Sequence, residues 1–140
     1  MNVQHELEIK RAPADVFALL TDPQRLPEWQ PTTVDVRRDR QGPLSVGEQF
    51  QEVHRGFGRE LLSTVEVVEY VPAERFALRI VSGALPFDGR WELAASPTGT
   101  RLRFTGELTS NGLVRLAKPL LARQFRGYHK RLRALLEHDA

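Results

Sequence analysis

Apolar and polar residues alternate at the start of the chain. A period of two is that of a β-strand with one face buried and the other in solvent. The pattern therefore predicts a first strand over residues 3–10. Its inward side chains are Val3, His5, Leu7 and Ile9.

The next segment predicts two short helices. Pro13 suits the first turn of a helix, where its missing N–H costs nothing. Pro23 likewise suits the first turn of a second helix, which Thr21 or Asp22 can cap. Later prolines limit the second helix to a turn or two, and it closes on Trp29.

Residues 32–109 predict antiparallel β-structure, because short alternating runs are separated by turn residues every 8–12 positions. One run breaks the alternation: Leu61 and Val65 have one parity, while Leu62 and Val68 have the other, which predicts a bulge or two-sided burial. The expected strands are 33–38, 46–55, 59–70, 75–82, 87–95 and 100–109.

Residues 113–137 predict one long helix of about 37 Å, capped by Ser110-Asn111-Gly112. Pro119 must kink this helix or mark its true start. Tyr128 falls in the apolar stripe and is expected in the core, whereas His129 is expected in solvent. The stripe contains Leu113, Leu116, Ala117, Leu120, Leu121, Gln124, Phe125, Tyr128, Leu132, Leu135 and Leu136.

This order of elements resembles the START-like superfamily, and within it the polyketide cyclase/dehydrase and lipid-transport branch often called SRPBCC. The resemblance implies an α+β helix-grip fold in which a curved antiparallel sheet of about six or seven strands wraps around the long helix. It covers nearly the whole chain, so residues 1–140 are expected to form a single domain. Its motifs are structural and indicate a fold, not an activity. The matching segments are 12–17, Asp22-Pro23 with Leu26 and Trp29, Val46-Gly47 with Phe50, Glu69-Tyr70 with Pro72, Arg75-Phe76, and 99–102.

The resemblance also implies a cavity between sheet and helix, and binding sites of this kind are concave and mostly apolar. Trp29 is either a platform for the ligand or a plug that seats the second helix. The other apolar candidates are inward by parity or helical phase, and each fits a pocket wall as well as plain core. They are Phe50, Phe76, Leu78, Ile80, Phe87, Trp91, Phe104, Leu116 and Leu120.

Three polar residues are candidates for contact with a ligand. Glu52 and His54 share the parity of Phe50, so they face the cavity if Phe50 does, and a buried Glu or His of this kind often marks a site. The alternative, which the pattern favours, is a frayed and solvated strand end. Gln124 lies in the apolar stripe of the helix, either against the ligand or at the margin of the stripe.

Several kinds of chemistry find no support in the sequence. There are no cysteines, which excludes disulfides and thiolate sites. The four histidines (5, 54, 129 and 138) have no metal-ligand spacing, and no phosphate loop, dinucleotide fingerprint or nucleophile elbow is present. We therefore expect no metal and no cofactor, and no catalytic residue can be assigned.

Charge is unevenly distributed along the chain. From Leu113 onward there are seven basic and two acidic residues, within a net charge of +2 overall. Such a segment can meet nucleic acid or an anionic membrane, but it is more often the solvated face of an amphipathic helix. We expect no nucleic-acid partner and no stable membrane insertion. The absence of a hydrophobic leader and of a long apolar run indicates a cytoplasmic protein, either a monomer or a homodimer.

Three functions remain open at this stage. The first is a carrier that holds a hydrophobic small molecule, such as a lipid, an isoprenoid or a polyketide-like aromatic. The second is a polyketide cyclase or dehydratase using the same cavity, for which only Glu52, His54 or Tyr70 could act as acid or base. The third is a module that binds a partner through the basic helix. The first is preferred because the candidate lining contains few ionisable groups.

Overall fold

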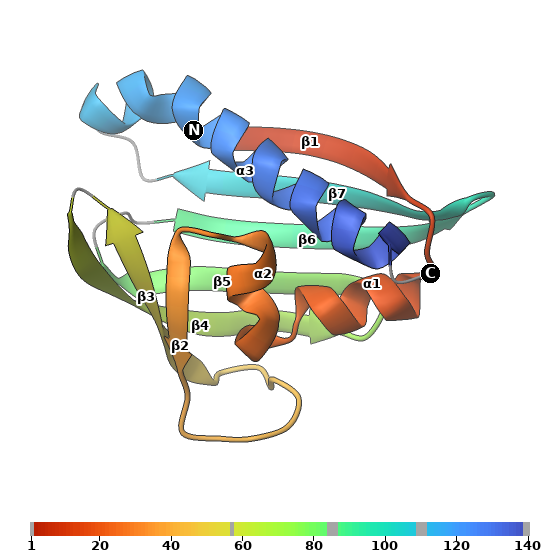
Figure 1. Ribbon diagram of the computed structural model, residues 1–140, viewed down its shortest axis with the longest axis horizontal. Helices are drawn as coiled ribbons and strands as arrows, with labels where there is room; N and C mark the ends of the chain where they lie inside the picture. Colours follow the sequence, from red (N-terminus) through yellow and green to blue (C-terminus); the bar gives the residue numbers. More distant parts are fainter. Residues whose placement is uncertain (1, 57, 84–86, 109–111, 139–140) are drawn as a thin grey trace.

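A computed structural model describes residues 2–56, 58–83, 87–108 and 112–138 of the chain. The predicted order of elements is confirmed, with boundaries that differ by at most three residues (Figure 1). The elements are β1 (Asn2–Ile9), α1 (Pro13–Leu20), the 3₁₀ turn η1 (Pro23–Arg25), α2 (Leu26–Trp29), β2 (Thr33–Arg37), β3 (Gln49–Gly56), β4 (Arg59–Val71), β5 (Arg75–Ser82), β6 (Phe87–Ser96), β7 (Gly99–Leu108) and α3 (Gly112–His138).

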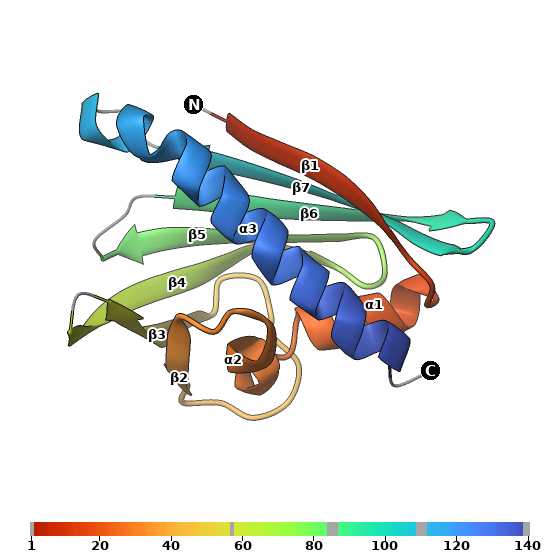
Figure 2. The same ribbon diagram turned by 45° about the horizontal axis from the view of Figure 1, so that its top comes forward.

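The strands form one antiparallel sheet in the order β1-β7-β6-β5-β4-β3-β2. Strands β2 to β7 follow one another as a meander, while β1 returns to pair with β7 at the far edge. Helix α3 runs diagonally across one face of this sheet and ends beside α1 (Figure 2). The predicted α+β helix-grip fold is therefore confirmed.

The two short helices close one end of the space between α3 and the sheet. Asp22 is the cap that starts η1, because its Oδ1 accepts a hydrogen bond from the backbone N–H of Gln24 at 3.1 Å. Helix α1 buries its apolar face, and both α1 and α2 contact α3. Trp29, the last residue of α2, is only 2% exposed.

Strand β4 contains the irregularity that the sequence predicts. Its pairing with β5 shifts register between Thr64 and Val65 and again between Val67 and Glu69. Val65 and Val67 nevertheless remain fully buried. The shifts lie on either side of these two valines, which are two residues apart and therefore share the interior face.

The buried side chains of α3 lie in its second half, and those of residues 116–120 are mostly exposed. Pro119 lies inside the helix, so the helix does not start after it. The cap proposed at Ser110 and Asn111 lies outside the described residues. Leu116 and Leu120 are 80% and 70% exposed, so the prediction that they face the interior is wrong. The buried face passes instead through Leu132 and Leu136, as well as Tyr128 and His129.

The geometry of a helix explains the error. Consecutive residues are rotated by about 100°, so Leu120 points well away from its neighbour Leu121, and Leu116 points farther still. The apolar stripe of the sequence is therefore wider than the face that the sheet covers.

Most of the described lysine and arginine side chains of α3 face solvent, as expected for an amphipathic helix. The exposed ones among the described side chains are Lys118, Arg123, Arg126, Lys130 and Arg131. Over the described ranges of the chain, no helix has the length and apolar character needed to cross a membrane.

Candidate functional site

A cavity of about 370 Å³ lies between α3 and the sheet. Its walls come from α2, from the segment that leads into β2, from strands β3 to β6 and from the middle of α3. The lining residues are Trp29, Gln30, Thr32, Glu52, His54, Arg55, Gly56, Leu61, Ser63, Val65, Leu78, Ile80, Phe87, Trp91, Leu121, Gln124, Phe125 and Tyr128.

The cavity brings together eight of the thirteen residues that the sequence singles out. These are Trp29, Glu52, His54, Leu78, Ile80, Phe87, Trp91 and Gln124. Leu116 and Leu120 lie on the exposed side of α3. Phe50, Phe76 and Phe104 are buried by at least 96% and form core outside the cavity wall.

Close packing explains why two of these phenylalanines do not reach the cavity. Phe76 lies between the rings of Phe17 and Trp91, with centroid distances of 6.3 and 5.7 Å. Phe104 lies beneath Phe125 and Trp91, at 5.0 and 5.1 Å. Parity assigns both rings to the interior face correctly, but other aromatic rings then cover them.

The apolar wall includes an aromatic stack that two glycines make possible. Phe87 of β6 stacks on Phe125 of α3, with ring centroids 4.9 Å apart and planes within 8°. Gly89 and Gly106 are paired opposite each other in β6 and β7. A Cβ on Gly106 would lie 2.7 Å from the Phe87 ring, so the absence of a side chain lets that ring lie close to the sheet.

Glu52 and His54 form the polar part of the cavity. Glu52 is 7% exposed, and its Oε1 accepts a hydrogen bond from the hydroxyl of Thr33 at 3.2 Å. The Nε2 atom of His54 lies 3.7 Å from the same oxygen. Burial raises the pKa of Glu52 to about 7, and burial lowers the pKa of His54.

The alternative that the sequence favours for these two residues, a solvated strand end, is wrong. Strand β3 does not fray there because β2 pairs with it, with Thr33 opposite His54. Thr33 is itself 1% exposed and bonds the carboxyl of Glu52. Both Glu52 and His54 are thereby held on the cavity side of β3.

A hydrogen bond between α3 and the segment before β2 borders this polar region. The hydroxyls of Thr32 and Tyr128 are 2.5 Å apart, and Gln124 also hydrogen-bonds Tyr128. Burial raises the pKa of the Tyr128 hydroxyl. Gln124 lies at the exposed margin of the helix stripe and yet contacts the cavity.

Sequence reasoning missed ten lining residues, among them Thr32, Ser63, Leu121, Phe125 and Tyr128. Helical spacing could have found three of them. Leu121, Phe125 and Tyr128 share a face with Gln124, at positions i, i+3, i+4 and i+7. The threonine and serine have no comparable signal, because a hydroxyl suits a strand surface as well as a cavity.

A buried chain of side chains supports the wall at Trp91. The indole Nε1–H of Trp91 donates to Nε2 of His129 at 2.9 Å, so the ring proton of neutral His129 is on Nδ1. That Nδ1 lies 2.6 Å from Nε2 of His5. Burial, reinforced by His5, lowers the pKa of His129 to about 3. His129 is 0% exposed, so the expectation that it lies in solvent is wrong.

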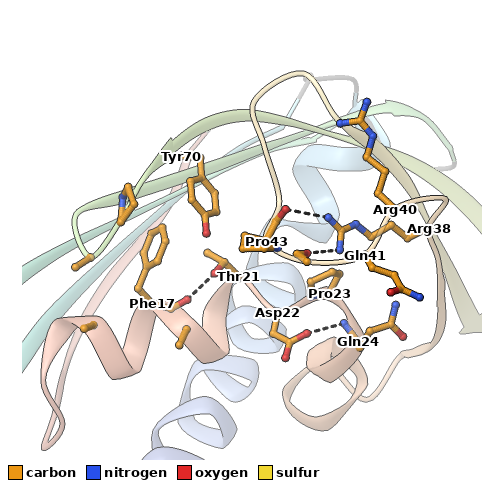
Figure 3. A pocket seen from close by; sticks show the side chains of 15 residues that line it. Phe17, Thr21, Asp22, Pro23, Gln24, Arg38, Arg40, Gln41, Pro43 and Tyr70 are labelled. Carbon is orange, nitrogen blue, oxygen red and sulfur yellow. Dashed lines mark hydrogen bonds between the residues drawn. The ribbon is translucent and has the colours of Figure 1, made fainter.

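A second hollow lies on the outside of the molecule, between α1, the loop that follows β2 and the end of β4 (Figure 3). It is larger, at about 770 Å³, and more open to solvent. Phe17 and Tyr70 lie side by side on its wall, with ring centroids 5.2 Å apart. Tyr70, a candidate acid or base, therefore lines this hollow and not the cavity that contains Glu52 and His54.

Arg38, on the wall of the outer hollow, holds the loop that follows β2. The guanidinium of Arg38 bonds the carboxylate of Glu48. It also donates to the carbonyl oxygens of Gly42 and Pro43 (Figure 3). Asp22 accepts from the backbone of Gln24. The hollow is thus a surface groove with a mixed lining, and the inner cavity is the better candidate site.

Metal chemistry finds no support in the described part of the chain. Among those residues, no three His, Asp or Glu side chains are grouped so that they could hold a metal ion.

A helix-grip sheet with an apolar cavity under its long helix is a hydrophobic-ligand-binding fold of the START-like class. The family model for polyketide cyclase/dehydrase and lipid transport matches residues 1–138. The chain therefore belongs to this family. Among curated proteins, no sequence is significantly similar to it.

Solved structures agree with the fold. NE0264 from Nitrosomonas europaea superposes with a TM-score of 0.82 at 19% identity, covering 99% of this chain and 96% of its own. MLL2253 from Mesorhizobium loti has a TM-score of 0.80 at 19% identity, covering 100% and 99%. Ara h 8.0201 has a TM-score of 0.80 at 15% identity, covering 99% and 98%. At these identities the likeness concerns the fold alone.

Proposed function

We propose that this protein is a cytoplasmic binding or carrier protein for a hydrophobic small molecule, acting as one START-like domain over residues 1–140. The observation that carries the proposal is the cavity of about 370 Å³ beneath α3, with walls of aromatic and aliphatic side chains. Its size lies within the range of small-molecule sites, and its lining is apolar with a few polar groups. Membership of a family whose description includes lipid transport supports the same reading.

Two adjacent residues of β5 provide the test. Ile80 lines the cavity, whereas its neighbour Val81 points the other way and is 45% exposed. Binding of the neutral dye N-phenyl-1-naphthylamine, followed by its fluorescence, should weaken at least tenfold in Ile80→Trp, because the larger ring occupies the space of the guest. Val81→Trp, the matched control, should bind as the wild type does.

Equal binding by both variants would show that the dye lies elsewhere, and a wild type that binds no neutral apolar probe would end the proposal. Circular dichroism of each variant checks that the fold is retained.

Proton-transfer catalysis of the cyclase or dehydratase type is the second candidate. The observation that favours it is Glu52, a carboxyl of raised pKa facing a cavity with His54 within 3.7 Å. General acid–base groups are tuned in this way. Catalysis would be established if the wild type turns over a β-hydroxy ketone probe and Glu52→Gln does not, while Glu52→Gln still binds the dye as the wild type does. If turnover does not exceed the uncatalysed rate, the catalytic hypothesis fails and the carrier function remains.

A further inference from the structure

We propose that the cavity selects an uncharged hydrophobic molecule that carries a hydroxyl group, and that this hydroxyl hydrogen-bonds with the carboxyl of Glu52. The inference rests on the proposed function, since it names the class of guest that the same cavity takes. It assigns to Glu52 the role of specificity-determining residue.

The polar and apolar groups of the cavity lie on different sides. Glu52 and His54 come from β3, at one end of the sheet order, and Thr32 precedes the edge strand β2. The opposite wall comes from β5 and β6, whose contributions are Leu78, Ile80, Phe87 and Trp91. A guest with one polar end and an apolar body therefore has a single favourable orientation.

Glu52 has hydrogen-bonding capacity that its partners among the described residues do not use. It accepts a hydrogen bond from Thr33 at Oε1, whereas a carboxyl group offers two oxygens and about four lone-pair sites. The side chain is buried and lines the cavity. A purely hydrocarbon guest would displace water from this carboxyl and leave it without compensation, which is unfavourable.

The charges around Glu52 argue against an anionic guest. The nearest basic group on the cavity wall, His54, has a lowered pKa and is neutral at physiological pH. Arg55 also contributes to the lining, but it is exposed to solvent. A carboxylate or phosphate beside Glu52 would meet a second acidic group with no buried cation between them.

A hydroxyl fits this site better than an ammonium group does. An ammonium would have to lose its water to pair with Glu52, and that desolvation offsets most of the Coulomb gain. A hydroxyl both donates and accepts, so it bonds the carboxyl whether Glu52 is protonated or ionised. The acceptor and donor groups nearby, on Ser63, Tyr128 and His54, add no net charge when neutral.

A series of naphthalenes with one changed substituent tests the inference. Dye displacement at pH 6 and pH 8 would compare 2-methylnaphthalene, 2-naphthol, 2-naphthoate and 2-naphthylmethylamine. We expect 2-naphthol to bind about fivefold more tightly than 2-methylnaphthalene at both pH values, which is the typical gain from one net hydrogen bond. The naphthoate should bind more weakly than either and weaken further at pH 8, where Glu52 ionises.

Variants of Glu52 identify the group responsible. In Glu52→Met, of similar length but without hydrogen-bonding atoms, the preference for 2-naphthol should vanish while 2-methylnaphthalene still binds. In Glu52→Gln the preference should persist. If Glu52→Met does not fold, the wild-type ranking at the two pH values decides by itself.

The failures of the two proposals are distinguishable. Equal affinity for 2-naphthol and 2-methylnaphthalene, or tightest binding of the naphthoate or the amine, would overturn the inference and leave the carrier proposal intact. Binding of none of the four would remove the carrier proposal itself.

Discussion

The imidazoles of His5 and His129 lie 2.6 Å apart, Nε2 to Nδ1, although 124 residues separate them in the chain. Trp91 extends this contact, because its indole N–H donates to the other nitrogen of His129. These two contacts link strand β1, strand β6 and helix α3 behind the cavity wall. This link depends on a neutral His129, since a protonated ring could not accept the hydrogen bond from Trp91.

This dependence predicts that the contribution of His129 to stability is lost in acid. The pKa of His129 is about 3 in the folded protein and 6.5 in an unfolded chain. Between these values the unfolded chain binds a proton that the folded protein does not, so the contribution of His129 to the free energy of unfolding decreases as the pH falls. The decrease approaches about 1.4 kcal/mol per pH unit for this one group.

Urea unfolding at pH 7.5 and pH 5 measures the effect in the wild type and in His129→Leu. The substitution should cost about 1 to 3 kcal/mol at pH 7.5, because it leaves the Trp91 N–H unpaired. The difference between the wild type and His129→Leu should narrow toward pH 5, because only the wild type loses the contribution of His129 there. His138→Leu, at an exposed position, should keep the pH dependence of the wild type. A difference that stays the same at both pH values would mean that His129 does not titrate in this way.

Glu52 predicts a pH dependence of the opposite sign. Its pKa is about 7 when folded against 4.5 when unfolded. Between pH 4.5 and 7 the folded protein holds a proton that the unfolded chain has released, so this group's contribution to stability is lost as the pH rises. Its full size is at most about 3 kcal/mol, the free-energy equivalent of the shift.

Glu52→Gln removes this titration and should therefore be more stable than the wild type at pH 8, with a smaller difference at pH 5. Thermal or urea unfolding at both pH values is the measurement. Glu60→Gln, at an exposed position of β4, is the control and should change little. A Glu52→Gln protein that gains nothing at pH 8 would mean that Glu52 is solvated, contrary to its placement in the cavity.

Two glycines predict opposite effects of the same substitution. Gly99 has a φ of +151°, and a Cβ there would lie 2.3 Å from the carbonyl oxygen of Ile9. Gly99→Ala should therefore destabilise the protein by about 2 to 3 kcal/mol. Gly127 lies inside α3 with open space around it, so Gly127→Ala should stabilise by about 0.5 to 1 kcal/mol.

Urea unfolding of both variants at pH 7.5 checks the pair. A tolerated alanine at Gly99 would contradict the close approach of the β6–β7 turn to the chain after β1. A loss of stability in Gly127→Ala would contradict the open surroundings of that residue.

The sequence predicts the fold closely but the site only in part. Period-two alternation and the spacing of prolines and turns indicate each strand and helix, because they depend on local geometry. Leu120 and His129 show the limit: which sector of α3 is covered depends on where the helix crosses the sheet, and no local pattern records that crossing. Glu52 shows another limit, since its burial depends on the partner strand β2.

Both tryptophans of the chain, Trp29 and Trp91, line the cavity, and neither lines the outer hollow. The most direct test of a guest in the cavity is therefore a titration of ¹⁵N-labelled protein with 2-methylnaphthalene, following the two indole N–H signals. We predict that both signals shift and saturate together with the backbone amides of Leu78 and Ile80. Unmoved indole signals, with shifts confined to residues of the outer hollow such as Phe17 and Tyr70, would contradict this account.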